Sequence, residues 1–431
     1  MPLSGVAEAV AKQGSVYKSF LTSHVLPSLT AARPTVIGVT IASANQLIPT
    51  IELLLAVRAA FPETYVVLGG NVVTRLRTQS SFRVLESLTD QIVLFQGERT
   101  FARILETIDR VGVAGARAAL ARVDGDEAIP CRLWPVPSFK GLDLTRGIGP
   151  TVLPYVSTRG CYWGKCRFCA ISAGWSSTGY GGSAPATQVA TQLGQIVAET
   201  GVSRLKFVDE ALPASKVRLL CTELGASGAN LEWEAYARLE KVWEDPALLA
   251  DARAAGLRKL YFGLEQVPSA TRGLLGKGDS GDPLRILLAC RQAEIMVHLF
   301  CMVGFPGTSR EDAKATVTFL RENESLVDTA DLVGFRLDRG TVVQGVRALP
   351  AGNADWLMSL PYEPAAEGVL SSQEVTELET ECQELLWQAT PRLLHPLYRV
   401  VGPWESVAQT AHGDIGTTTG VTCSANCSST L

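Results

Sequence analysis

The chain has 431 residues, of which 46% are apolar and 19% charged; this length allows two or three domains with a large core, and the composition excludes a wholly disordered chain. The formal net charge of −4 excludes an overall basic field, so we expect no nucleic-acid partner. No apolar run reaches the roughly 18 residues of a membrane span, and the first residues lack the apolar core of a signal peptide, so we expect a cytoplasmic protein without a membrane partner.

Residues 1–121 alternate short apolar runs with helical patterns, which predicts a Rossmann-like α/β domain whose parallel sheet is covered by helices. The expected strands are residues 35–41, 64–70 and 91–98, and the expected helices are residues 46–60, those near 80–89 and those from 101 onward. Small and polar residues follow these strands, namely Ser43, Asn45, Gly69, Gly70, Gly97 and Glu98. Open α/β sheets bind ligands at such strand ends, although residues 1–121 contain no G-x-G-x-x-G and the glycines would also serve simple turns.

Residues 122–150 are rich in proline and glycine and are interpreted as a linker to a second domain. The alternation then resumes over residues 151–345. The strand-like runs there are residues 152–157, 203–210, 231–237, 257–265, 295–305 and 331–337, and the helical stretches between them are residues 186–199, 213–224, 246–255, 283–293 and 310–321. Six strand–helix units predict a partial (β/α)6 barrel of the TIM type, with its functional groups at the carboxyl ends of the strands.

The alternation weakens after residue 345. We expect a short helical region over residues 346–405, in which residues 372–389 form an acidic amphipathic helix. The last residues, 406–431, are rich in Ser, Thr, Gly and Cys and include Cys423 and Cys427. Such a composition cannot build a core, so we expect a disordered tail.

The strongest signal is the run Cys161-Tyr-Trp-Gly-Lys-Cys166-Arg-Phe-Cys169. Three thiolates within nine residues are able to wrap one cuboidal four-iron cluster. Three ligands on four irons leave one iron open, and an open metal position is where a substrate binds.

Three other interpretations of this run exist. Structural zinc takes four protein ligands, and the next candidates along the chain are the distant Cys221 and His298. A plant-type two-iron ferredoxin shares the C-x4-C-x2-C spacing but needs a fourth cysteine, and its β/α surroundings differ from those found here. Three incidental buried cysteines are the remaining possibility.

With its cysteine run placed directly after a first barrel strand, the sequence resembles the radical S-adenosylmethionine (radical SAM) enzymes. The stretches VDE (208–210), YFGLE (261–265) and MVGFP (302–306) resemble further motifs of that superfamily. The resemblance implies a [4Fe-4S] cluster on Cys161, Cys166 and Cys169, with S-adenosylmethionine held by Phe168, Asp209, Glu210, Arg238, Glu265, Gly304 and Pro306.

The roles that the resemblance implies are specific. Phe168, Gly304 and Pro306 would lie against the adenine, Asp209 and Glu210 would hold the methionine amine, and Arg238 would pair with a carboxylate. Structural alternatives remain for several of the candidate residues. Asp209 and Glu210 would also serve as a helix cap, Glu265 as an ion-pair partner, and Gly304 with Pro306 as a turn.

The first 120 residues resemble the cobalamin-binding half of cobalamin-dependent radical SAM proteins. The matching stretches are PTVIGVTIASANQLIP, TYVVLGGNVVTRL and QIVLFQGERT. The resemblance implies that Ser43, Asn45, Gly69, Gly70, Gly97 and Glu98 contact cobalamin. No D-x-H-x-x-G stretch is present, so no histidine is nominated as a lower cobalt ligand. The 34 residues before TVIGVT are fewer than the first two strands of that family need, so we expect an N-terminally truncated domain with an exposed sheet edge.

The resemblance implies cleavage of S-adenosylmethionine to a 5′-deoxyadenosyl radical. Members associated with the maturation of ribosomally made peptide natural products are the most similar group, which favours cobalamin-dependent C-methylation of a peptide or small natural product. A flavodoxin or ferredoxin is expected as electron donor by analogy. The alternatives are a radical SAM cyclase, oxidase or epimerase without cobalamin methyl transfer, and a degraded, non-catalytic peptide-binding partner.

Overall fold

The structure is a computed structural model that describes residues 1–125, 128–145, 150–171, 174, 179–228, 230–278, 281–350 and 354–394. The predicted tail, residues 406–431, lies outside the described residues together with the last part of the predicted C-terminal region. Within the described part of the chain, every helix is too short or too polar to cross a membrane.

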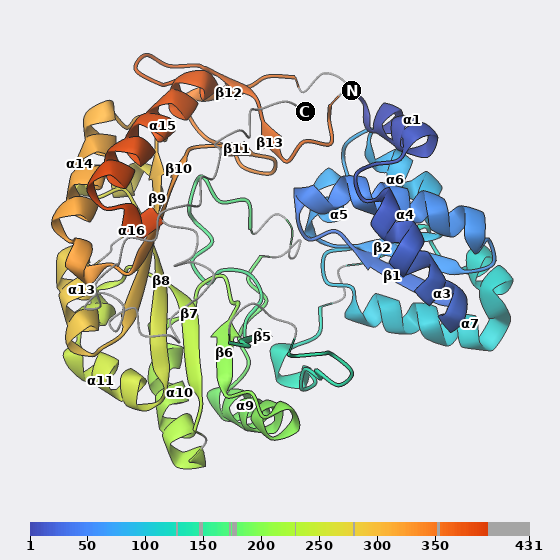
Figure 1. Ribbon diagram of the computed structural model, residues 1–431, viewed down its shortest axis with the longest axis horizontal. Helices are drawn as coiled ribbons and strands as arrows, with labels where there is room; N and C mark the ends of the chain where they lie inside the picture. Colours follow the sequence, from blue (N-terminus) through green and yellow to red (C-terminus); the bar gives the residue numbers. More distant parts are fainter. Residues whose placement is uncertain are drawn as a thin grey trace, which may run out of the picture.

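The N-terminal domain is built on a parallel four-stranded sheet (Figure 1). Its strands, in spatial order, are β1 (Val36–Thr40), β2 (Tyr65–Gly69), β3 (Gln91–Leu94) and β4 (Val123–Gly125). The first three confirm the predicted strands. The fourth, β4, falls inside the segment interpreted as a linker, 122–150, so the sheet extends further along the chain than expected. Among the described residues, β1 is an edge strand that pairs with β2 alone.

Helices lie on both sides of this sheet. They are α1 (Leu3–Gln13), α2 (Lys18–Phe20), η1 (Leu21–Val25), α3 (Leu26–Ala32), η2 (Ala44–Gln46), α4 (Leu47–Ala60), α5 (Asn71–Leu76), α6 (Phe82–Leu88) and α7 (Glu98–Ala119). Helix α4 forms where expected because Leu47, Ile51, Leu54 and Val57 recur every three or four residues and are all buried. Helices α1–α3 and α5 were not predicted.

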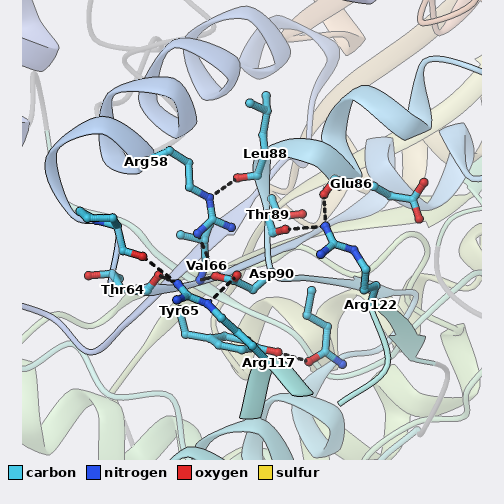
Figure 2. A network of polar contacts seen from close by, with 12 residues as sticks. Arg58, Thr64, Tyr65, Val66, Glu86, Leu88, Thr89, Asp90, Arg117 and Arg122 are labelled. Atoms are coloured by element: carbon cyan, nitrogen blue, oxygen red, sulfur yellow. Dashed lines mark hydrogen bonds and ion pairs between the residues drawn. The ribbon is translucent and has the colours of Figure 1, made fainter. Parts of the chain in front are cut away.

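A network around Asp90 fixes the amino-terminal end of this sheet, away from the strand ends expected to bind ligands (Figure 2). The carboxylate accepts hydrogen bonds from the Val66 amide at 2.7 Å, from Arg58 at 3.0 Å and from Arg117 at 3.0 Å. These donors belong to β2, α4 and α7. Asp90 directly precedes β3, so one side chain joins two strands and the helices on either side of the sheet.

The second domain is a six-stranded parallel sheet in the order β10-β9-β8-β7-β6-β5, which confirms the predicted partial barrel. Its strands are β5 (Leu153–Tyr155), β6 (Arg204–Phe207), β7 (Glu232–Arg238), β8 (Leu257–Glu265), β9 (Met296–Val303) and β10 (Thr329–Gly334). In β7, Trp233, Ala235 and Ala237 join the apolar core. The alternate residues Tyr236 and Arg238 therefore point to the opposite, inner face of the sheet.

Helices cover the outer face of this sheet (Figure 1). Those that contribute several side chains each to the core are α9 (Ala186–Thr200), α10 (Ala214–Ser227), α11 (Pro246–Ala254), α13 (Pro283–Gln292) and α14 (Arg310–Glu322). The domain also contains η3 (Cys131–Leu133), η4 (Lys241–Glu244), α12 (Ser269–Leu274) and η5 (Glu324–Leu326). The five helices predicted for this domain are confirmed as α9, α10, α11, α13 and α14. Because the sheet and its helices share one core, the loops at the carboxyl ends of the strands are held on a rigid base.

The chain then returns toward the N-terminal domain. The elements are β11 (Leu337–Asp338), β12 (Val346–Ala348), β13 (Ser359–Leu360), β14 (Tyr362–Pro364), α15 (Ser372–Ala389) and α16 (Pro391–Leu394). Helix α15 confirms the predicted amphipathic helix. The expectation of a helical region from residue 346 was wrong for its first part, because two antiparallel strand pairs, β11–β13 and β12–β14, form there.

We call residues 337–350 and 354–360 the return segment, since both of its parts contain residues that contact the N-terminal domain. Arg75 of α5 donates two hydrogen bonds to the Arg339 carbonyl, at 3.0 and 2.6 Å. Asp355 accepts from Ser80 at 2.6 Å, and the Trp356 indole donates to the carbonyl of Met1 at 3.0 Å. The two domains are thus joined at a second place, far along the chain from β4 and β5.

Candidate active site between the two domains

The three cysteines lie in the loop after β5, residues 160–169, which we call the cysteine loop. Their thiols are free and half-buried. Burial raises the pKa of Cys166 and raises that of Cys169 to about 12, and the neighbouring thiols push both values in the same direction. Lys277 and Arg238 act against this and lower the pKa of Cys166. The thiols therefore lie close enough to repel one another as anions, beside two cations that stabilise thiolates.

A single metal ion and a cluster make different demands on the donors that bind them. Among the described residues, no three His, Cys, Asp or Glu side chains are grouped so that they could hold one. An ion such as zinc needs all its donors about 2 Å from one centre. A four-iron cluster takes each thiolate on a different iron, so it does not require the three thiols to meet at one point.

The cysteine loop is docked on the loop that follows α12. Trp163 donates from its indole nitrogen to the Gly276 carbonyl at 2.8 Å, and the Arg167 amide donates to the Leu275 carbonyl at 3.0 Å. The Trp163 ring also packs so closely on Gly278 that a Cβ there would overlap it. The sequence stretch GLLGKG thus has a definite role, which is to present its backbone to the cysteine loop.

Arg238, at the carboxyl end of β7, lies beside the cysteine loop. Its guanidinium stacks on the Trp163 ring, 3.8 Å from the ring centroid, and donates to the Lys277 carbonyl. It also forms an ion pair with Glu240 at 3.4 Å. The side chain is 7% exposed, and its Nε has no hydrogen-bond partner among the described residues. A buried guanidinium with a spare donor is a suitable partner for a carboxylate.

Glu265 ends β8 in a left-handed backbone conformation, with φ +61°, at an irregularity in the pairing with β9. Its carboxylate forms an ion pair with Lys277 at 2.9 Å, and Lys277 also donates to the Gly263 carbonyl at 2.6 Å. The contacts of Glu265 are therefore those of the alternative in which it serves as an ion-pair partner. Through Lys277 it still reaches the cysteine loop, since Lys277 acts on Cys166.

The motif after β9 builds an apolar wall. Gly304 has φ +73°, and a Cβ there would lie 2.8 Å from Val375 of α15, so glycine is required both by the backbone and by the packing. Phe305 lies edge-on to Phe168 of the cysteine loop, with centroids 6.5 Å apart. The structure thus brings Phe168 together with the Gly304–Pro306 turn, as the predicted adenine contacts require.

Asp209 and Glu210 follow β6 but have different surroundings. Asp209 is 2% exposed, and its carboxylate accepts from the amides of Ser157 and Thr158 at 2.6 and 2.8 Å. These bonds occupy it within the fold. Glu210 is half-buried and close enough to Cys169 to raise the pKa of that thiol. Of the pair, Glu210 is the one that stays near the predicted methionine site.

A cavity of about 560 Å³ lies at the carboxyl ends of β1, β2 and β3. It is lined by Gly38, Val39, Thr40, Ala42, Val67, Gly69, Gly70, Asn71, Val93, Phe95, Gln96, Gly97, Glu98, Phe101, Arg159 and Gly174. Four of the six predicted cobalamin contacts are among them, and Ser43 and Asn45 are not. Ser43 instead forms a capping box with Gln46 at the start of η2, and both residues are exposed.

Arg159 is a lining residue that sequence reasoning missed. It precedes Cys161 by two positions, yet it donates to Glu98 and, at 3.3 Å, to Gln96 of the N-terminal domain. Its guanidinium also stacks on Trp134. The only sequence signal was its place between β5 and the first cysteine. The cavity is therefore closed on one side by the base of the cysteine loop.

Comparison with known proteins agrees with this geometry. Residues 155–320 match the radical SAM superfamily. No match was found among curated proteins. The structure of the radical SAM methyltransferase TsrM from Kitasatospora setae, solved with cobalamin and a [4Fe-4S] cluster, superimposes with a TM-score of 0.58 at 16% identity, covering 90% of this chain and 83% of that one.

A second solved structure gives the same result. The cobalamin-dependent radical enzyme OxsB, solved with aqua-cobalamin and S-adenosylmethionine, superimposes with a TM-score of 0.54 at 16% identity, over 90% of this chain and 54% of that one. At this identity the likeness is one of fold, and it extends over most of this chain. Residues 155–320, with the cysteine loop at their start, are a radical SAM domain, and the chain carries it behind a Rossmann-like domain.

Proposed function

We propose that the protein is a radical SAM methyltransferase that uses cobalamin to methylate a carbon atom of a peptide or small natural product. The observation that carries the proposal is the position of the N-terminal cavity, whose wall includes Arg159 from the base of the cysteine loop. A ligand in that cavity would lie next to the cluster site. When bound, the cluster supplies the electron that cleaves S-adenosylmethionine, and cobalamin supplies the methyl group.

The residues around the cysteine loop fit the cluster and S-adenosylmethionine. Cys161, Cys166 and Cys169 would hold the cluster, with Lys277 and Arg238 offsetting its negative charge. Phe168 and the Gly304–Pro306 turn would enclose the adenine in apolar surroundings that exclude water. The spare donor of Arg238 would orient a carboxylate, and Glu210 a cationic amine.

The cavity fits a large, flat ligand. Gly69, Gly70 and Gly97 keep its wall free of side chains, and a Cβ at Gly97 would lie only 2.7 Å from Val93. Asn71 is one of the lining residues, and its buried Oδ1 has no hydrogen-bond partner within the described structure, which suits a ligand amide. Histidine is not among the lining residues, so the described cavity offers no imidazole as a lower cobalt ligand.

The solved relatives support the proposal by their own ligands. TsrM has been solved with its tryptophan substrate and a SAM analogue, and OxsB with aqua-cobalamin. Each superimposes over 90% of this chain, which includes both the Rossmann-like sheet and the partial barrel. The identity of the methylated compound in this protein is a separate question, which product analysis answers.

The test is metal and ligand content of the anaerobically reconstituted protein supplied with hydroxocobalamin. We expect about four irons and one cobalt per chain. Cys166→Ala should lose most of the iron, while Cys221→Ala, a buried cysteine outside the loop, should keep it. Ala42→Trp should lose cobalt by filling the cavity, and the exposed Ala32→Trp should retain it.

Product mass then separates the outcomes. A gain of one methylene, about 14 Da, in the substrate would support methylation. Iron without cobalt, with a substrate that loses two hydrogens, would replace the proposal by a radical cyclase or oxidase. A full cluster that never cleaves S-adenosylmethionine would identify a non-catalytic binding partner.

A further inference from the structure

The base of the cysteine loop is a short antiparallel pair, which we call the neck: Ser157, Thr158 and Arg159 on the outgoing side, and residues 181–184 on the returning side. Thr158 and Ser183 form a β-bridge. The Gly181 amide donates to the Arg159 carbonyl at 2.9 Å, and the Ala184 amide donates to the Ser157 carbonyl at 2.9 Å. Cys161 lies only two residues beyond the neck, so the placement of the neck sets the placement of the first thiol.

We infer that Asp209 and Lys216 are positioning residues that lock this neck and thereby set the geometry in which the cysteine loop receives its cluster. The inference rests on the proposed function in one respect, that the cysteine loop is the iron–sulfur site. It assigns Asp209 a different task from the predicted contact with the methionine amine. It also gives a task to Lys216, which no sequence motif singled out.

Asp209 holds the outgoing side of the neck from β6. Its carboxylate accepts the amides of Ser157 and Thr158 at 2.6 and 2.8 Å, and it also accepts the Ser157 hydroxyl. Hydrogen bonds from three donors to one ionised carboxylate are strong and directional. They fix two consecutive peptide planes, which apolar packing alone would leave free to shift along the strand.

Lys216 joins both sides of the neck from α10. Its ammonium donates to the Ser157 hydroxyl at 2.9 Å, to the Ser157 carbonyl at 3.3 Å and to the Ser183 hydroxyl. The residue is 7% exposed. Ser157, which is wholly buried, is therefore held by a carboxylate and an ammonium at once, and Ser183 is tied to the same ammonium from the returning side.

The two charges depend on each other. Burial raises the pKa of Asp209 and lowers the pKa of Lys216 to about 8, and each charge favours the ionised form of the other. A buried pair contributes little net stability against apolar replacements but strongly opposes the loss of one partner. Here the pair instead holds the neck in a single defined position, and the position of the neck determines where the cysteines lie.

Three variants test the inference. Asp209→Asn keeps the volume but replaces one acceptor oxygen with a donor that faces the neck amides, and Ser157→Ala removes only the hydroxyl shared by Asp209 and Lys216. The matched control is Asp328→Asn. Asp328 also accepts a backbone amide, that of Val297 at 2.7 Å, and burial also raises its pKa, but it lies at the opposite end of the barrel strands.

The first readout uses the metal-free full chain, so it does not depend on the cluster. Hydrogen exchange of the Ser157 and Thr158 amides should be slow in the unaltered protein and in Asp328→Asn. It should be at least tenfold faster in Asp209→Asn and in Ser157→Ala. The second readout uses reconstituted protein: loss of iron to a chelator should be at least tenfold faster in the two neck variants, and their cluster EPR spectrum should change shape.

Each outcome of these measurements either supports or overturns the inference. Equal amide exchange and equal iron loss in all proteins would overturn the inference. Faster amide exchange with unchanged iron loss and EPR would reduce Asp209 to a purely structural residue and would also overturn it. If Asp209→Asn does not fold, Ser157→Ala decides by the same measurements. A lack of iron in the unaltered protein would refute the proposed function instead, while the amide exchange would still report on the lock.

Discussion

The guanidinium of Arg159 donates to the carboxylate of Glu98, joining the base of the cysteine loop to the first turn of α7 in the other domain. Glu98 opens α7, where a carboxylate is favoured by the helix dipole. Both side chains border the N-terminal cavity. The pair is therefore a direct physical link between the two sites that the proposed function combines.

A double-mutant cycle should detect this link. We expect Arg159→Gln and Glu98→Gln to show a coupling of about 0.5–1 kcal/mol in urea unfolding at pH 7, since both side chains are partly exposed. Burial alone would raise the pKa of Glu98. The hydrogen bond from Arg159 and the attraction of its positive charge outweigh burial, so the pKa of Glu98 is lowered. The coupling is thus present above the unfolded pKa of about 4.3 and lost as pH falls through the lower folded value.

The pair Arg253 and Glu294 provides the control for this cycle, because Glu294 is 81% exposed. Its coupling should be indistinguishable from zero. An equal coupling in both cycles would show that Arg159 and Glu98 are an ordinary surface pair rather than a link between the domains.

Asp90→Asn should destabilise the N-terminal domain by about 2–4 kcal/mol. The carboxylate is mostly buried and joins β2, α4 and α7 (Figure 2). Burial raises the pKa of Asp90, but the bonds from Val66, Arg58 and Arg117 outweigh it and lower the pKa. The stabilisation is therefore complete above the unfolded pKa of about 3.9 and disappears as pH falls through the folded value.

Chemical unfolding at pH 7 and pH 3 checks the Asp90 prediction. The difference between the unaltered protein and Asp90→Asn should shrink at the lower pH. Asp109→Asn on the exposed side of α7 is the control and should unfold like the unaltered protein at both. A constant difference at the two pH values would contradict the assigned role of the charge.

Gly304→Ala should cost about 2–3 kcal/mol, because an L side chain is strained at φ +73° and its Cβ would press on Val375. Adding Val375→Ala should recover part of the loss by removing the contact but not the strain. Gly194→Ala is the control, since that glycine lies inside α9 with free space around it. Thermal unfolding of the four proteins measures this, and a loss from Gly194→Ala equal to that from Gly304→Ala would contradict it.

Lys277→Met should make the cluster harder to reduce. Lys277 lowers the pKa of Cys166, so its positive charge acts at the cysteine loop and favours added negative charge there. We expect a shift of the midpoint potential to more negative values by tens of millivolts, where about 59 mV equals a factor of ten for one electron. EPR-monitored titration measures it, with the exposed Lys314→Met as a control that should not move the potential.

All strands of the second sheet, β1 to β3 of the first sheet and most helices could be predicted, because buried parallel strands are short apolar runs between turn residues. The strand β4 has only three residues and follows a helix directly, so its pattern is too short to separate from a linker. The strands β11 and β13 have two residues each, and β12 and β14 have three each, so their patterns are also too short to recognise. Helix α1 was predictable in hindsight, since Leu3, Val6, Ala7 and Val10 follow helical spacing.

Within the site, spacing along the chain identified the cysteines, and the resemblance placed Phe168, Arg238 and Gly304 near them. The roles that it could not assign depend on partners far away in sequence. Asp209 binds residues 51 and 52 positions before it, and Arg159 meets a residue 61 positions before it in another domain. No local pattern contains such pairings, because they follow from how the two sheets are placed against each other.

The contacts of the return segment determine when the N-terminal domain is able to finish folding during synthesis. Arg75 and the carbonyl that it binds are 264 residues apart. A ribosome that adds about 5–20 residues per second makes the second partner roughly 10–50 s after the first. For that interval the N-terminal domain is outside the ribosome without the segment that covers it, and Met358 has yet to join its core. The domain therefore completes its folding only when nearly all of the barrel has been synthesised.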